Sequence, residues 1–349
     1  MTILRIGLAL AALCLAAACD NDVELLSDDP GVPVVYGLID GSRDQQVLSV
    51  TRTFRFSEGS NALESARQAD SVYYSAEGLT VVARNQRTGT STTLSRRDFS
   101  ADGVVRPEGV FAPEPVIGYT WDLSAVEGLP GDSIQIEGSV EGGGTFATGG
   151  VLLPMLEPRN LSGLPNSYNL LGDRGETQFR FDRGDVGAEI SVFEVGLNFE
   201  ITEIGAGGEE RTQVLYYPLE RNRTSGVDRN SISVANERFN GVYGFLSDRL
   251  EADPEVTRRL DNVQGVVIGG DAAFVEFRTL QNANSGITAT QELPVFSNVD
   301  GGLGLISAVT RLEQRSDATL NARSLDSLRE GFQTRDLNFC ITNSSGNCR

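Results

Sequence analysis

Over residues 193–202 every second side chain is large and apolar, and the side chains between them are polar or glycine. Side chains point alternately to the two faces of a β-strand, so this pattern buries one face and leaves the other in water. The pattern therefore predicts a strand whose buried face carries Phe193, Val195, Leu197, Phe199 and Ile201. We expect a turn at 205–210 and a hairpin partner at 212–219.

Shorter runs of the same kind predict a mainly β protein. Strand patterns at 33–39, 79–83, 117–123 and 132–140 are separated by turns and follow one another at the spacing of a β-sandwich. We predict an immunoglobulin- or transthyretin-like sandwich over residues 32–154. One or two helical turns at 60–70 are expected to decorate it.

A second β-rich domain is predicted over residues 155–349, and it should carry a pair of helices. The first helix is indicated near 235–251 by apolar residues three and four apart, and the second near 254–260 by Asp253 and Pro254 at its start. Other expected elements of this domain are strands at 262–269 and 272–280, a helix at 324–332 and a final strand at 334–342.

The charged residues exclude several chemistries. All 29 basic residues are arginine, since the sequence has neither lysine nor histidine, and 48 acidic residues bring the net charge to −19. Nucleophile activation by histidine, imidazole metal ligands, lysine Schiff bases and the lysine of a phosphate-binding loop are therefore all excluded. A strongly acidic chain with scattered arginines also argues against nucleic acid as a partner. We expect no cofactor and no metal site.

The first nineteen residues have the features of a bacterial lipoprotein signal. Arg5 precedes thirteen apolar or small residues, 6–18, which end directly before Cys19. Thirteen helical residues rise only about 20 Å, too little for a hydrocarbon core of about 30 Å. We predict a signal peptide over 1–18 and acylation of Cys19 by fatty acids such as palmitate. An ordinary secretory signal is the alternative.

The residues after Cys19 predict a tether and a place in the cell. Residues 19–31 are acidic and rich in turn-forming residues, which makes packing against a core unfavourable. Several acyl chains on one cysteine anchor a protein almost permanently. The acidic stretch directly after Cys19 resembles the signal that sends lipoproteins of Bacteroidota to the outer face of the outer membrane. This resemblance implies a lipid-anchored protein of the outer membrane, displayed on the cell surface; a solvated spacer is the alternative.

Cys340 and Cys348 are expected to form a disulfide. An exported chain meets an oxidising compartment, where an even pair of cysteines favours a disulfide over a metal or redox site. The residues between them are small and turn-forming, which allows the two ends to approach. Such a bridge would hold the end of the chain in place.

Two other kinds of site were considered. Tyr119, Trp121, Tyr216 and Tyr217 could stack on a sugar, although alternating aromatics in strands more often pack in a core. A pair of carboxylates could hydrolyse a glycosidic bond if a cleft held them about 5–10 Å apart, but with 48 acidic residues the sequence cannot locate such a pair. No residue is predicted to be catalytic.

Several segments resemble a group of uncharacterised exported lipoproteins of Bacteroidota. The segments 33–40, 46–56 and 59–62 occur in the order in which that group has them, and so do 236–250, 253–256 and 296–304. The resemblance covers about residues 32–312 and departs at 305–308. It implies a β-rich exported lipoprotein without assigned catalytic residues.

Together these observations predict a non-catalytic binding or accessory module, anchored to the outer membrane by its N-terminal lipid. Its expected partners are an outer-membrane protein complex, such as a nutrient transporter, or a glycan. A purely structural envelope protein and a carboxylate-based hydrolase of a surface polymer are the alternatives.

Overall fold

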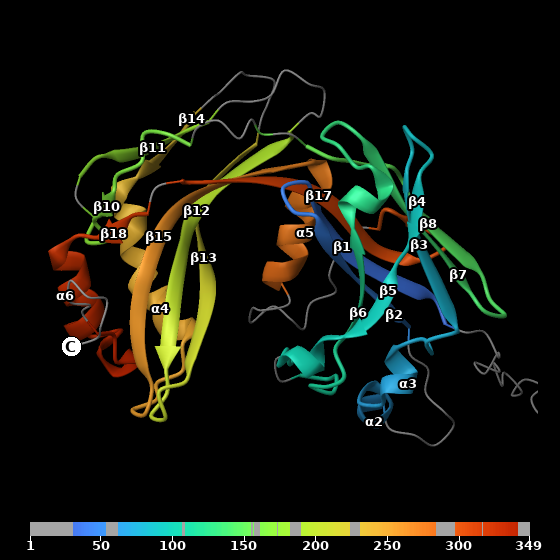
Figure 1. The fold of residues 1–349 in the computed structure, drawn as a ribbon, viewed down its shortest axis with the longest axis horizontal. Coiled ribbons are helices and arrows are strands. Elements are labelled where there is room, and N and C mark those ends of the chain that lie inside the picture. The colour runs from blue at the N-terminus through green and yellow to red at the C-terminus, as the bar shows by residue number, and fades with distance from the viewer. Residues whose placement is uncertain are drawn as a thin grey trace, which may run out of the picture.

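A computed structural model describes residues 31–53, 62–106, 109–154, 156, 161–172, 174–181, 190–223, 231–283, 297–315 and 317–340. Among these residues, 46% lie in strands and 19% in helices, which confirms a mainly β fold. The chain forms an arch of two lobes joined across its top by strands (Figure 1). No helix in the described part combines the length and the apolar character needed to cross a membrane.

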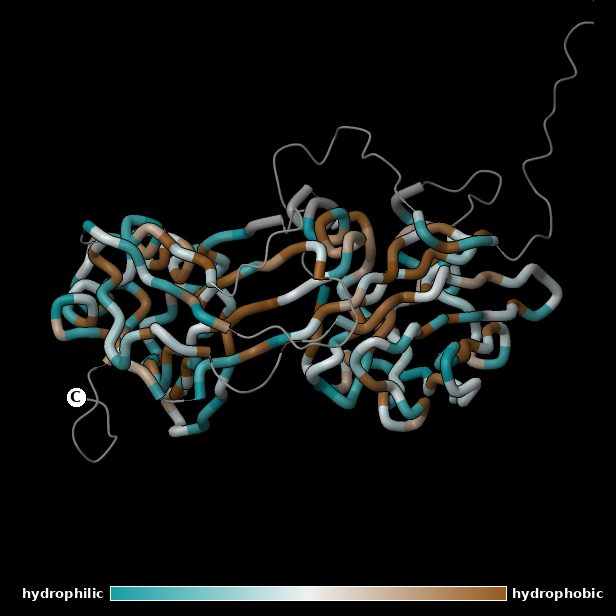
Figure 2. Tube along the Cα trace, turned by 90° about the horizontal axis from the view of Figure 1, so that it is seen from above, coloured by the Kyte–Doolittle hydropathy of each residue, from teal (hydrophilic) through white to brown (hydrophobic). Residues whose placement is uncertain are grey.

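One eight-stranded sheet runs through both lobes. Its parallel pair is β1 with β17, where Val34 lies beside Leu303 and Asp40 beside Val309; the other neighbours are antiparallel. Seen from above, apolar segments pass from one lobe to the other (Figure 2). In sheet order its strands are β13 (Glu210–Arg223), β12 (Val192–Ile204), β15 (Thr257–Gly270), β17 (Leu303–Glu313), β1 (Pro33–Asp40), β2 (Gln45–Arg52), β6 (Ile117–Asp122) and β5 (Ser95–Asp98).

The N-terminal lobe packs a second sheet against β1, β2 and β6. Val35, Leu48 and Trp121 of the first sheet share one buried cluster with Val81 and Ile136 of the second. Two helices, α2 (Ala62–Ala66) and α3 (Ala69–Val72), lie at one end of this lobe (Figure 1). The second sheet contains β16 (Val299–Asp300), β8 (Thr145–Thr148), β7 (Ser133–Val140), β3 (Leu79–Asn85) and β4 (Ser91–Thr93), with β9 (Val151–Leu152) paired to β7.

The C-terminal lobe is built on the alternating strand that the sequence predicts. Phe193, Val195, Leu197, Phe199 and Ile201 of β12 are all buried in one cluster. The opposite face was predicted to lie in water, and this is wrong for Glu194, Gly196 and Thr202, which are buried as well. Ion pairs with Arg221 and Arg278 allow Glu194 to be buried there. The covering elements are β10 (Ser167–Tyr168), β11 (Glu176–Arg180), β14 (Ser231–Ala235), β18 (Thr319–Leu320), α4 (Val242–Arg249) and α6 (Ala322–Glu330). Short 3-10 helices are η1 (Phe99–Asp102), η2 (Leu123–Val126), η3 (Asn236–Gly241) and η4 (Arg335–Leu337).

Helix α5 (Ala272–Ala283) packs on the opposite face of the shared sheet. Phe274 is buried against Val192, Ile268 and Val309, which come from three different strands. The strand predicted at 272–280 is wrong, because these residues form a helix. The Asp271 carboxylate accepts a hydrogen bond from the Phe274 amide at 2.9 Å, which caps the start of a helix.

The second helix of the expected pair, near 254–260, is also wrong, whereas η3 and α4 lie within 235–251 as predicted. Asp253 closes only one turn, since its carbonyl accepts from the Val256 amide at 3.3 Å. From Thr257 the chain continues as β15 beside β12. The buried Arg258 side chain fixes this course by donating to Glu203 at 2.9 Å and to the Leu337 carbonyl at 3.0 Å.

The predicted final strand at 334–342 is replaced by η4 and an isolated bridge between Phe339 and Arg258. Asn338 has a φ of +54°, a left-handed conformation that interrupts an extended strand. Residues 341–342 lie outside the described part. The helix expected at 324–332 is present as α6.

Candidate functional site

The cysteines singled out in the sequence lie at the limits of the described residues. Cys19 and Cys348 fall outside them. Cys340 is disulfide-bonded, and its amide donates to the Arg258 carbonyl at 2.9 Å. The pairing of Cys340 with Cys348 and the acylation of Cys19 therefore stay predictions.

The four aromatic side chains considered as a sugar platform do not form one. Tyr119 and Trp121 are only 3% and 5% exposed and belong to the core of the N-terminal lobe. Tyr216 packs with the cluster beneath α5, and Tyr217 lies against Phe245 with their ring centres 5.2 Å apart. These aromatics thus lie in different parts of the two lobes and do not form one exposed platform.

Two buried carboxylates form ion pairs with arginines. Glu194 is fully buried and paired with Arg221 and Arg278. Burial raises the pKa of Glu194, but the hydrogen bonds and charges of Arg278 and Arg221 outweigh burial and lower it. Asp40 is paired with Arg311 at 2.7 Å. These groups are fixed by ion pairs, which makes proton transfer to a substrate unfavourable.

Asp271 is a partly buried carboxylate that caps a helix. It accepts a hydrogen bond from the Ser307 hydroxyl at 2.7 Å besides capping α5. Burial raises the pKa of Asp271, and these hydrogen bonds only partly offset the effect of burial. No cluster of three or more acidic or cysteine side chains within the described ranges could hold a metal ion.

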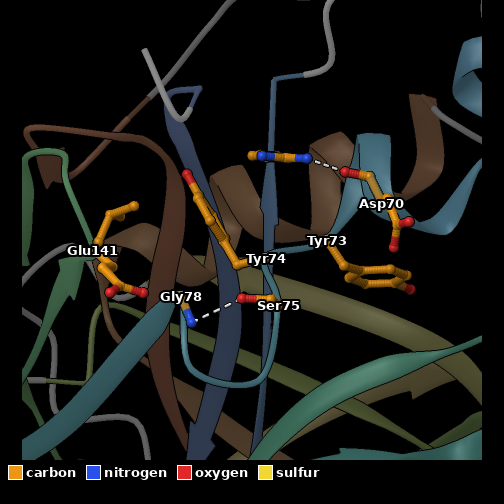
Figure 3. A pocket seen from close by; sticks show the side chains of 8 residues that line it. Asp70, Tyr73, Tyr74, Ser75, Gly78 and Glu141 are labelled. Carbon is orange, nitrogen blue, oxygen red and sulfur yellow. Dashed lines mark hydrogen bonds between the residues drawn. The ribbon is translucent and has the colours of Figure 1, made fainter. Parts of the chain in front are cut away.

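The best candidate site is a pocket of about 290 Å³ in the N-terminal lobe. It is built where α3 leads into β3, beside the ends of β2 and β7 (Figure 3). Its lining residues are Arg52, Asp70, Tyr73, Tyr74, Ser75, Gly78, Val140 and Glu141.

Backbone and side-chain hydrogen bonds hold the pocket wall in place. The Tyr74 hydroxyl donates to the Gly31 carbonyl at 3.1 Å, and the Gly78 amide donates to the Ser75 hydroxyl at 2.9 Å. The Arg52 guanidinium lies 5.6 Å from the centre of the Tyr74 ring and donates to the Asp70 carbonyl. The pocket is thus formed by residues distant in sequence but fixed to one another.

The lining groups suit a small polar ligand. Figure 3 shows Tyr74 standing between Glu141 on one side and Asp70 with Tyr73 on the other. A guanidinium and carboxylates around one hollow can bind acceptors and donors of the same molecule. Tyr74 is only 4% exposed, so its ring does not offer a stacking face.

This pocket was not predicted from the sequence. Its residues come from three segments of the chain, and only the tertiary fold brings Arg52, Tyr74 and Glu141 together. The local signal was the adjacent pair Tyr73 and Tyr74 directly after a short helical segment, which indicates a fixed turn but no ligand.

No protein-family model matches the chain, and no curated protein matches it.

Proposed function

We propose that the protein is an exported, lipid-anchored module of the cell surface that binds a ligand or partner without catalysing a reaction. Fatty acids on Cys19 hold it to the outer membrane, and the acidic segment 19–31 spaces it from the bilayer. The N-terminal lobe is an immunoglobulin- or transthyretin-like sandwich, and the C-terminal lobe is attached to it through the shared sheet.

The observation that carries the proposal is the position of Gly31, the first described residue, relative to Cys19. Gly31 lies twelve residues after Cys19, and its carbonyl is bonded to Tyr74 in the wall of the pocket. Twelve extended residues span at most about 43 Å. An anchor on Cys19 would therefore hold the pocket within a short distance of the membrane, where a transporter-associated module would meet its partner.

Acylation and location are tested by intact-mass analysis of the envelope fraction and by labelling whole cells with an impermeant reagent. We expect the mass of a chain that begins at an acylated Cys19, surface labelling, and loss of both in Cys19→Ser. An unacylated N-terminus or full-length protein in the cytosol would overturn the proposal.

Ligand binding is tested by thermal shift with glycans and peptides, and partner binding by pull-down with the lipid-free mature chain. A ligand of the pocket should raise Tm in proportion to its saturation. Glu141→Gln should remove that shift, while Glu237→Gln, an exposed acid in the other lobe, should keep it. Equal shifts in both variants would place the ligand elsewhere.

A second candidate, carboxylate-based hydrolysis of a surface polymer, is favoured by one observation. Asp70 and Glu141 line the same pocket. If they acted as acid and base, Asp70→Asn and Glu141→Gln would each abolish release of sugar from the polymer. Binding that survives without any turnover in the wild-type chain favours the non-catalytic module.

A further inference from the structure

The loop between η1 and β6 exposes an unusual number of apolar side chains. Val104, Val105, Val110 and Phe111 are 46%, 57%, 54% and 42% exposed. No other turn in the described ranges has more than one large apolar side chain so exposed. We call residues 103–106 and 109–113 the apolar loop. Exposed apolar groups gathered in one place indicate a contact surface.

Contacts to the body of the lobe fix the apolar loop. The Arg106 amide donates to the Pro113 carbonyl at 3.1 Å, which joins the two arms of the loop. The Arg106 guanidinium lies 5.8 Å from the Phe111 ring centre and 5.2 Å from the Tyr73 ring centre. These contacts hold the described parts of the loop, with their exposed side chains, in place at the surface.

Two adjacent tyrosines make hydrogen bonds to the end of the apolar loop and to the start of the described chain. The Tyr73 hydroxyl donates to the Pro115 carbonyl, next to the loop, at 3.1 Å. The Tyr74 hydroxyl donates to the Gly31 carbonyl, also at 3.1 Å. Figure 1 shows the connection from β5 to β6 at the same end of the lobe as α2 and α3. The start of the described chain and the end of the loop are thus both bonded to the segment that follows α3.

The apolar loop has no net charge, unlike the chain as a whole, and this favours contact with a lipid surface. The whole chain has a net charge of −19, whereas residues 103–113 contain one arginine and one glutamate and are neutral. Neutral apolar side chains enter the boundary between headgroups and acyl chains.

We propose that the apolar loop inserts into the surface of the phospholipid bilayer that carries the anchor and fixes the orientation of the N-terminal lobe. This inference rests on the lipid anchor of the proposed function. The acyl chains supply the attachment, and Val105, Val110 and Phe111 make a second contact that holds the lobe against the membrane instead of leaving it free on its tether.

The test uses the full acylated chain reconstituted in phosphatidylcholine vesicles, with no other protein. Val110→Cys and Phe332→Cys are labelled with an impermeant maleimide; Phe332 is 87% exposed and lies beyond the end of α6, in the other lobe. We expect labelling of Val110→Cys to be at least tenfold slower than that of Phe332→Cys, and equal rates after detergent is added. Equal rates on vesicles overturn the inference, as does protection that occurs only in native envelopes, which would indicate a protein partner.

A second measurement tests insertion of the apolar loop even if intact-mass analysis shows no acyl chain. The chain from Asp20 onward retains every described residue, and its binding to the same vesicles is measured by flotation. We expect Val105→Asp with Val110→Asp to weaken binding at least tenfold and Phe332→Asp to leave it unchanged. An equal loss in both variants, or no binding by the wild-type chain, overturns the inference.

Discussion

Asp132 shows how one buried carboxylate organises a turn. Its side chain is 4% exposed and accepts hydrogen bonds from the Leu129 amide at 3.0 Å and from Asn85 at 2.8 Å, besides its ion pair with Arg87. The hydrogen bond from Arg87 is the main cause that lowers the pKa of Asp132 from 3.8 to about 2. Because the folded-state pKa is the lower one, the stabilisation is complete above the unfolded pKa and is lost as the pH falls towards 2.

We therefore expect Asp132→Asn to lower the free energy of unfolding by about 1–3 kcal/mol at pH 7. The difference between variant and wild type should shrink as the pH falls from 3.8 to about 2. Urea denaturation at several pH values measures both effects. Asp102→Asn is the control, since its pair with Arg97 is 44–46% exposed and should contribute less than about 1 kcal/mol. A difference that stays constant with pH would contradict this account.

Glu194 is the carboxylate on which two arginines of different elements depend. Arg221 belongs to β13 and Arg278 to α5, and both pair with the fully buried Glu194. Glu194→Gln keeps the shape but leaves two guanidinium groups without their counter-charge, so we expect a loss of about 3–5 kcal/mol. Chemical denaturation measures it, with Glu313→Gln, an exposed residue bonded to Asn198 at 3.3 Å, as the control. Equal effects of the two variants would show that the buried pairs do not matter.

At the scale of elements, β17 depends on a glycine. Gly304 has a φ of +118°, and a Cβ there would collide with the Val35 carbonyl oxygen of β1. We expect Gly304→Ala to destabilise the protein by about 3 kcal/mol or more, because it combines strain with loss of strand pairing. Thermal unfolding measures the effect against Gly144→Ala, where no atom lies within 4 Å of the added methyl group. Similar Tm values for the two variants would contradict the tight β1–β17 contact.

The sequence predicted those elements whose pattern is set by one buried face. The alternation of β12 was clear because one side of that strand meets the C-terminal core and the other does not. The apolar residues of α5 were taken for a strand. Asp271 caps this helix by accepting a hydrogen bond from the Phe274 amide, but in the sequence Asp271 looks like part of a turn. Residues 254–260 were taken for a helix because the contacts that bury Arg258 are not visible in the local sequence.

The candidate site was less predictable than the fold. Its residues do not form a motif, because Arg52, Tyr74 and Glu141 meet only after β2, α3 and β7 have packed together. The absence of lysine and histidine limits which chemistry the chain can perform, but it does not say where a ligand binds. The location of the pocket therefore required the tertiary structure.

At the scale of the whole molecule, the two lobes share their strands. The predicted sandwich at 32–154 contains β1 through β9, yet β17 pairs with β1 and β16 pairs with β8, and both come from the C-terminal part of the chain. Ile306 and Ala308 of β17 and Val299 of β16 also lie in the core of the N-terminal lobe. Strands from both ends of the sequence thus complete one structure.

We expect residues 32–154 expressed alone to remain unfolded or to aggregate, because the fragment would expose the edge of β1 and the core residues that β16 and β17 cover. Amide NMR spectra of the fragment should be poorly dispersed. The chain from Asp20 onward is the control and should give a dispersed spectrum and one cooperative unfolding transition, since β17 pairs with strands of both lobes. A well-dispersed spectrum from the fragment would show that the sandwich folds without the late strands, and the lobes would then be separate domains that the shared sheet only joins.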